Sequence, residues 1–205
     1  MKNKKNIRNT VFAFLLIGLW LARYFSFNAK IAKLYTTPQL FYSKNEAVEY
    51  GSNIINLHTY TGCNIMLRKA QLFDAVDFFS KFNVEPMLEA TVLGKAQDEK
   101  VCVLQVDFTN NSNYHREFDL GDLLIRGEDT MFGILNCVGE INRSLCLNEN
   151  SKLKAEPGET LMVQIPVLII RNTFSDSEWA RINEYKLYLV VTQFPEEQTI
   201  RIEYD

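Results

Sequence analysis

The charges of this sequence divide the chain into two parts that must meet different environments. Residues 1–45 carry eight Lys or Arg side chains and no Asp or Glu, whereas residues 46–205 carry 14 basic and 25 acidic side chains. The balance of the second part is −11, within a net charge of −3 for the whole 205-residue chain. An acidic surface repels nucleic-acid phosphates, so we expect no nucleic acid among the partners.

A membrane is the environment that best fits the basic part. The polar, positive residues 2–8 precede twelve uncharged residues, 11–22, and a second apolar patch follows Arg23. A helix needs about 20 residues to cross the hydrocarbon of a bilayer. The pattern therefore predicts a basic cytoplasmic tail at residues 1–9 and an uncleaved transmembrane anchor at residues 10–27. Because basic flanks stay inside, the remaining chain should be extracytoplasmic, on a single-pass protein of the cell membrane.

Two alternatives to the anchor remain open. The basic start and the short apolar core also fit a cleaved signal peptide, although no good site of two small residues follows: Trp20 lies two positions before Ala22, and Phe27 two before Ala29. A buried helix of a soluble domain usually keeps one polar face, and residues 11–22 have none.

The larger part of the chain shows the two-residue period of β-strands. Residues 28–45 mix polar residues without a sustained period, which predicts a stalk, and residues 46–205 should form the folded domain. The clearest strands are expected at 100–109, 160–171, 185–194 and 199–204, and weaker ones at 47–50, 64–72, 87–93 and 123–126. Pro166 removes a hydrogen-bond donor, which predicts that its strand lies at an edge or carries a bulge.

Two short helices interrupt the strands. Asp74 can cap a helix at residues 75–82, and Ser175 with Glu178 three residues later forms a capping-box pattern that should start a helix running to Ile182. We expect a mainly β protein, an Ig-like β-sandwich with two short helices preceded by one N-terminal transmembrane helix. We also expect a core that buries Phe108, Ile165, Trp179 and Leu189.

Several landmarks occur in an order that resembles a known group of proteins. They are Val48-Glu49-Tyr50-Gly51, Tyr60-Thr61-Gly62, Leu72-Phe73-Asp74, Phe78-Phe79, residues 106–112, Pro157-Gly158-Glu159, Phe174-Ser175 with Trp179, and residues 185–192. With the anchor, they resemble membrane-anchored, extracytoplasmic Ig-like domain proteins of unknown function from Gram-positive bacteria. The resemblance covers about residues 46–203. It implies an architecture and carries no catalytic residue.

The residue types that perform chemistry are sparse. His58 and His115 are far apart, and no zinc, nucleophile-elbow or phosphate-loop pattern is present. We therefore expect no catalytic residue and no cofactor. Four carboxylates form a weak candidate site for Ca²⁺, which prefers oxygen ligands, although a solvated acidic loop explains them more simply; they are Asp119, Asp122, Glu128 and Asp129.

The four cysteines differ in their surroundings. Cys102 alternates with apolar residues, which predicts a buried free thiol, and Cys63 has no evident partner. Cys137 and Cys146 are separated by eight residues and are the candidate disulfide, if the segment between them folds back. Two free thiols at these positions remain the alternative, because sequence does not fix connectivity.

The function expected from these patterns is binding and not catalysis. We expect a non-enzymatic, membrane-anchored extracytoplasmic domain whose ligand is a protein or another envelope component. Two alternatives stay open: an envelope hydrolase that uses the acidic residues near 119–129, and a structural subunit of an assembly. The sequence gives no oligomeric state.

Overall fold

The structure is a computed structural model. It describes residues 17–27, 38–50, 61–84, 98–120, 123–127, 131–135, 138–143, 152–192 and 196–205. The chain divides into two compact units, residues 1–38 and 39–205.

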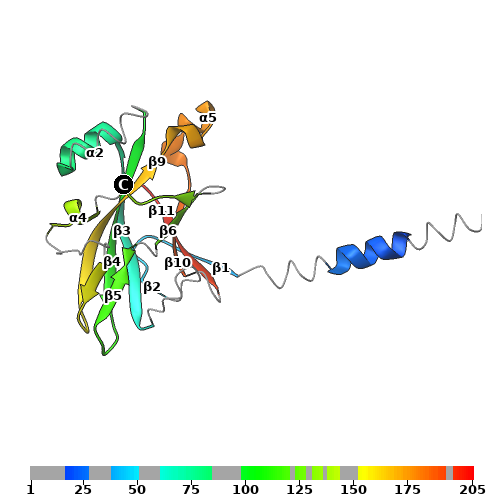
Figure 1. The fold of residues 1–205 in the computed structure, drawn as a ribbon, viewed down its shortest axis with the longest axis horizontal. Coiled ribbons are helices and arrows are strands. Elements are labelled where there is room, and N and C mark those ends of the chain that lie inside the picture. The colour runs from blue at the N-terminus through cyan, green and yellow to red at the C-terminus, as the bar shows by residue number, and fades with distance from the viewer. Residues whose placement is uncertain are drawn as a thin grey trace, which may run out of the picture. The chain divides into compact units, whose positions relative to one another are not determined.

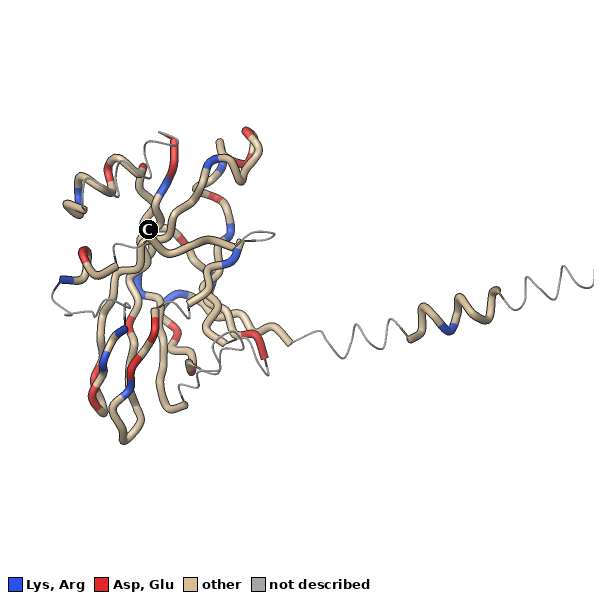
Figure 2. The backbone as a smooth tube through the Cα atoms, in the orientation of Figure 1, with Lys and Arg blue, Asp and Glu red and all other residues tan. Residues whose placement is uncertain are grey.

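The described part of the first unit is a helix at residues 17–27. Its large apolar side chains are exposed, and Trp20 stacks on Tyr24 one turn later with ring centroids 5.5 Å apart. Arg23 is its one charged residue, and Figure 2 shows the helix uncharged apart from one basic position. Within the described ranges, no helix is long and apolar enough to cross a membrane. Residues 10–16 of the expected anchor lie outside those ranges.

The second unit is built from strands in two layers (Figure 1). One sheet has the order β1 (Gln39–Tyr42), β11 (Glu197–Ile202), β10 (Leu187–Thr192), β6 (Leu124–Arg126), β7 (Met131–Phe132). The other has the order β2 (Val48–Glu49), β3 (Cys63–Asp74), β4 (Lys100–Asn110), β9 (Thr160–Ile169). A two-stranded ribbon joins β5 (Arg116–Asp119) to β8 (Lys152–Ala155). All pairs are antiparallel except β1 with β11.

The described residues of this unit also include short helices. They are α2 (Ala75–Phe82), α4 (Val138–Ile141), α5 (Asp176–Trp179) and two 3₁₀ turns, η3 (Arg171–Thr173) and η4 (Ile182–Glu184). The first expected helix has the predicted bounds. The second ends at Trp179, three residues before its expected end, and a separate 3₁₀ turn covers Ile182.

The main core lies between the two large sheets and follows the alternation read from the sequence. Phe108, Ile165 and Leu189 are each fully buried in it, as predicted. Trp179 packs against this core but is only partly buried, so the expectation of full burial was wrong. Its helix is a single turn whose four residues include no buried one. The fold is therefore mainly β and sandwich-like, with a few short helices.

A smaller core covers the other face of the four-stranded sheet. Phe78 and Phe79 of α2 pack on Val101 and Val103 of β4, and Ile141 of α4 packs against the same cluster. Because Cys102 and Leu104 face the main core, β4 is buried on both faces along this stretch. A strand that is buried on both faces has a nearly continuous run of apolar residues, and residues 101–104 form such a run.

A β-bulge near Arg68 changes the direction of the side chains along β3. Up to Leu67, the odd-numbered residues Cys63, Ile65 and Leu67 face the main core, and after the bulge Ala70 does. The extra residue therefore moves Lys69 onto the outer face of the sheet, opposite Gln105 of β4. Arg68 donates to the Asp107 carboxylate over 2.6 Å.

Asn142 and residues 133–135 form hydrogen bonds along the outer edge of β9, the edge to which the nitrogen of Pro166 points. The Asn142 side chain accepts from Gln164 N–H at 2.8 Å and donates to Gln164 C=O at 2.7 Å, as a neighbouring strand would. Leu135 N–H donates to Pro166 C=O at 2.8 Å, and Leu168 N–H donates to Gly133 C=O at 3.1 Å. Pro166 lies in an edge strand, as predicted, and its missing N–H falls on the side away from β4.

Asn110 joins the turns at one end of the sandwich. It is completely buried and its side-chain amide donates to Tyr114 C=O at 2.7 Å and to Ala155 C=O at 3.0 Å. Its side-chain oxygen accepts from the Ser112 N–H at 3.0 Å and from the Ser112 hydroxyl at 2.6 Å. The amide group thus ties the end of β4 to β8 and to the turn that leads into β5.

Several strands were not expected or fall elsewhere. β1 lies inside the range 28–45 that was assigned to a stalk, so the β structure begins before residue 46. The pairs that hold β5, β7 and β8 were also missed, because these strands have only two to four residues and β5 and β8 are rich in charged side chains. The strand expected at residues 87–93 lies outside the described residues.

We predict that Asn110→Ala lowers the free energy of unfolding of the domain by roughly 3–4 kcal/mol, because several buried partners lose their hydrogen bonds. Chemical denaturation measures the change. The exposed Asn113→Ala in the same turn is the matched control and should change the free energy by less than about 0.5 kcal/mol. Equal stability of the Asn110→Ala variant and the unchanged protein would contradict the role given to this amide.

Candidate functional site

The outer face of the five-stranded sheet presents large apolar side chains to solvent. Phe41 of β1 is 59% exposed and Met131 of β7 is 67% exposed. Tyr188 of β10 lies between them in the strand order, and its ring centroid is 5.8 Å from that of Phe41. Tyr188 pairs with Arg126, and Arg126 pairs with Met131. These three residues therefore form one row across the strands, on the same face of the sheet. We call Phe41, Tyr188 and Met131 the aromatic face.

An ion pair between strands crosses this sheet. Arg126 of β6 contacts Glu197 of β11 at 2.8 Å, across the intervening strand β10. Both side chains are mostly buried, at 25% and 18% exposure, so solvent screens this pair less than an exposed one. Val190 and Thr199, which share the outer face, are almost fully buried.

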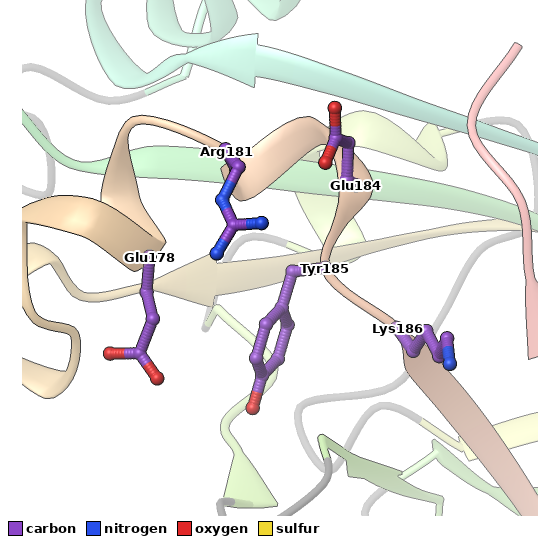
Figure 3. A pocket seen from close by; sticks show the side chains of 5 residues that line it. All are labelled: Glu178, Arg181, Glu184, Tyr185 and Lys186. Atoms are coloured by element: carbon purple, nitrogen blue, oxygen red, sulfur yellow. The ribbon is translucent and has the colours of Figure 1, made fainter.

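A charged pocket lies just before the start of β10, the strand that carries Tyr188. Its volume is about 250 Å³, and Glu178, Arg181, Glu184, Tyr185 and Lys186 line it. Figure 3 shows the Arg181 guanidinium and the Tyr185 ring beside each other, with the Glu178 carboxylate nearby. Lys186 lies two residues before Tyr188 and therefore points to the same side of the chain. The apolar centre and the charged pocket can form one surface.

An aromatic cluster supports the wall of this pocket. Phe174 packs edge-to-face on Tyr185 at 5.0 Å between ring centroids and stacks on Phe132 at 6.0 Å. Trp179 contacts Phe174 at 5.7 Å and carries the Arg171 guanidinium over its ring at 5.4 Å. Gly127 leaves room for Tyr185, because a side chain at that position would meet the tyrosine ring at 2.8 Å.

The capping box predicted from the sequence keeps one glutamate of the pocket, Glu178, ionised. The Ser175 hydroxyl and the Ser175 N–H donate to the Glu178 carboxylate at 2.6 and 2.8 Å. These hydrogen bonds, the hydroxyl's first, lower the pKa of Glu178 below its ordinary value. The carboxylate thus stays negative to lower pH than a free glutamate, beside the guanidinium of Arg181.

Only one of the four carboxylates proposed for Ca²⁺ lies among the described residues, so that site stays a prediction. Asp119 lies in β5, in register with Lys152 of β8, and Asp122, Glu128 and Asp129 lie outside the described residues. Within the described ranges, no three His, Cys, Asp or Glu side chains are placed to hold a metal ion. His115 contacts Glu156 at 2.6 Å on an exposed part of the surface. His58 is outside the described residues.

The described thiols are buried. Cys102 is fully buried, as predicted, and desolvation raises the pKa of its thiol strongly, which makes it unreactive. Cys63 is also a buried free thiol, and burial raises its pKa as well. Cys137 and Cys146, the candidate disulfide, lie outside the described residues, so the bond stays a prediction.

The sequence predicted the capping box, which includes Glu178 of the charged pocket, but it did not predict the aromatic face. Phe41 was assigned to a stalk, because a four-residue strand that pairs with the far end of the chain leaves no local period. Its pairing with Thr199 joins residues 158 positions apart, and only that register places it near Tyr188.

Comparison with known proteins gives a family and similar solved structures. The family model described as a domain of unknown function (DUF5028) matches residues 41–198. A functionally unknown protein from Listeria monocytogenes is similar in structure, with 8% identity, a TM-score of 0.44, and 72% of this chain and 81% of that chain covered. An uncharacterized beta-sandwich protein from Clostridium difficile 630 has 10% identity, a TM-score of 0.42, and coverage of 82% and 97%. No curated protein matches the chain.

We predict that Ser175→Ala raises the pKa of Glu178 toward its ordinary value, because both the hydroxyl donor and the cap are lost. A carboxyl group whose pKa is lowered on folding stabilises the fold above its unfolded pKa and loses that contribution as the pH falls through its folded pKa. The unchanged protein should therefore exceed the Ser175→Ala variant in free energy of unfolding by more at about pH 7 than at about pH 3. NMR titration and denaturation measure both. Ser177→Ala, which leaves the contacts to Glu178 in place, is the control; an unchanged pKa in Ser175→Ala contradicts the assignment.

Proposed function

This chain belongs to the family of DUF5028 domains, and we propose that it is a membrane-anchored, extracytoplasmic interaction domain that binds a protein partner and performs no catalysis. The aromatic face is the observation that carries the proposal. Aromatic residues, Met and Arg are enriched at protein interfaces. Phe41, Tyr188, Met131 and Arg126 combine these types on one sheet surface.

The charge around the aromatic face supports a protein partner. The pocket beside it presents both signs, from Glu178, Glu184, Arg181 and Lys186. A rim of mixed charge selects a partner by electrostatic complementarity, while an apolar centre supplies most of the affinity. The hydrolase alternative needs a cleft with paired carboxylates, and its acidic residues near 119–129 are described only at Asp119.

The anchor is proposed from two properties of the N-terminal segment. The described helix at residues 17–27 exposes apolar side chains around its circumference, among them Leu19, Trp20 and Phe25. In water, such a surface would be unfavourable by roughly 25 cal/mol for each Å². The uncharged residues 11–16 precede it in the sequence, and basic residues 2–8 come before them. A bilayer satisfies the apolar surface and the basic flank together.

We also propose that the sandwich is Ig-like. In an Ig sandwich, strands A, B and E are neighbours in one sheet, and C, F and G are neighbours in the other. The neighbours β3-β4-β9 and β6-β10-β11 follow this order along the chain. The described residues include no strand in the place of D, beside β9, where Asn142 and residues 133–135 make contact instead.

We predict that the N-terminal peptide is retained in membranes and that the domain faces outward. Mass spectrometry of the membrane-extracted full chain should recover residues before Val11, and protease added to intact cells should digest residues 46–205. A mature protein that begins near residue 30 and is released into the medium would contradict the anchor. Digestion after lysis alone would contradict the orientation.

We predict that replacing the aromatic face abolishes the contact with its partner. A photoreactive amino acid at Met131 of the full chain should give one major crosslinked protein in intact membranes. Phe41→Ala combined with Tyr188→Ala should reduce that crosslink at least tenfold, because the apolar centre of an interface supplies most of its affinity.

Tyr114→Ala is the matched control, because Tyr114 is 73% exposed and lies in the turn before β5, away from the aromatic face. Its crosslink should equal that of the unchanged protein. Melting curves check that the double variant is folded. An undiminished crosslink in a folded double variant would contradict the proposed site.

A further inference from the structure

The opposite sheet carries a groove with a different chemistry. It lies on the outer face of the four-stranded sheet, beside the C-terminal end of α2, and has a volume of about 170 Å³. The described side chains that line it come from β3, β4, β9 and α2; they are Lys69, Gln71, Lys81, Phe82, Val103, Gln105 and Gln164. A water-sized atom needs roughly 10–15 Å³ of such volume, so the groove has room for about a dozen non-hydrogen atoms.

Three of these residues form a straight row across the strands. Lys69 pairs with Gln105, and Gln105 pairs with Gln164, so their side chains stand next to one another on one face. The β-bulge near Arg68 is what brings Lys69 to this face. Bulges often direct a side chain into a functional site. Asn142 holds the backbone of Gln164 through two hydrogen bonds, which fixes the far end of the row.

The groove is basic although the domain is acidic. Among the described residues that line it are two lysines and no carboxylate. The nearest row carries Asp107, whose carboxylate is neutralised by Arg68 at 2.6 Å. Lys81 is held over the Phe73 ring at 4.4 Å, at the side of the groove. The groove therefore offers positive charge on a body with a balance of −11 over residues 46–205.

The remaining groups match a polyhydroxylated ring. A carboxamide both donates and accepts hydrogen bonds, as a hydroxyl group does, so a row of glutamines can satisfy neighbouring hydroxyls. The ring of Phe82 and the side chain of Val103 supply apolar surface for the C–H groups of a sugar. We propose that this groove binds a single sugar ring that carries an anionic substituent, a carboxylate or a phosphate, with the lysines on the charge and the glutamines on the hydroxyls.

The test uses the full chain in a detergent without a sugar headgroup, titrated with glucuronic acid, glucose 6-phosphate and glucose at equal ionic strength. Saturation-transfer NMR measures each dissociation constant. At least one anionic sugar should bind ten or more times as tightly as glucose, and the tighter of the two identifies the substituent. Equal binding of all three, or no binding of any, overturns the proposal.

Two variants separate the roles within the groove. Lys69→Met should weaken binding of the anionic sugar about tenfold and leave glucose unchanged. Gln105→Glu keeps the side-chain volume but adds a negative charge, so it should weaken the anionic sugar more than glucose. If either variant fails to fold, Lys81→Met replaces it, with the outcome expected for Lys69→Met. Unchanged affinity in the folded variants overturns the proposal.

Lys186→Met is the matched control, because this lysine lies in the pocket on the other side of the sandwich. It should leave sugar binding unchanged. A tetraglutamate peptide serves as the competing anion without hydroxyls. Tighter binding of this peptide than of either anionic sugar would overturn the proposal in favour of an acidic peptide. The test does not use the aromatic face, so its failure is distinct from failure of the proposed protein partner.

Discussion

The register between β3 and β4 is the constraint on which the rest of the domain depends. It runs along the full length of both strands and contains one shift, near Arg68. Near Val103, β4 is buried on both faces, because the main core covers one side and the aromatic side chains of α2 cover the other. Because of the shift, Leu67 before Arg68 and Ala70 after it both point into the main core, while Lys69 stays in solvent. A strand without the bulge would turn Lys69 into the core.

The ends and edges of this sheet are closed by side-chain amides. Asn110 satisfies backbone groups of the turn that follows β4, and Gly158 N–H donates to its C=O at 2.7 Å. Asn142 does the same for the outer edge of β9, where a free row of N–H and C=O groups would invite pairing with another chain. At the edge of β9, the Asn142 side chain thus takes the two hydrogen bonds that a further strand would make to Gln164.

The elements that could be predicted are those with a sustained local period. β4 and β9 are long and carry apolar residues at every second position, so their positions and the faces that they turn to the main core followed from the sequence. The capping box at Ser175 was equally clear, because its two partners are three residues apart. β1 and the ribbon of β5 with β8 were missed, because a four-residue strand has too few positions to show a period. The bulge near Arg68 was invisible, because it appears only against a partner strand.

The candidate sites were less predictable than the fold for the same reason. Phe41 meets Tyr188, and Lys69 meets Gln105 and Gln164, only through registers that join distant segments. Each strand gives one face to the core, so the outer faces of the two sheets vary independently. Figure 1 shows the sheets as separate layers, with the aromatic face on one and the groove on the other. Because a packed core lies between the two sheets, the site proposed for a protein and the groove proposed for a sugar do not overlap.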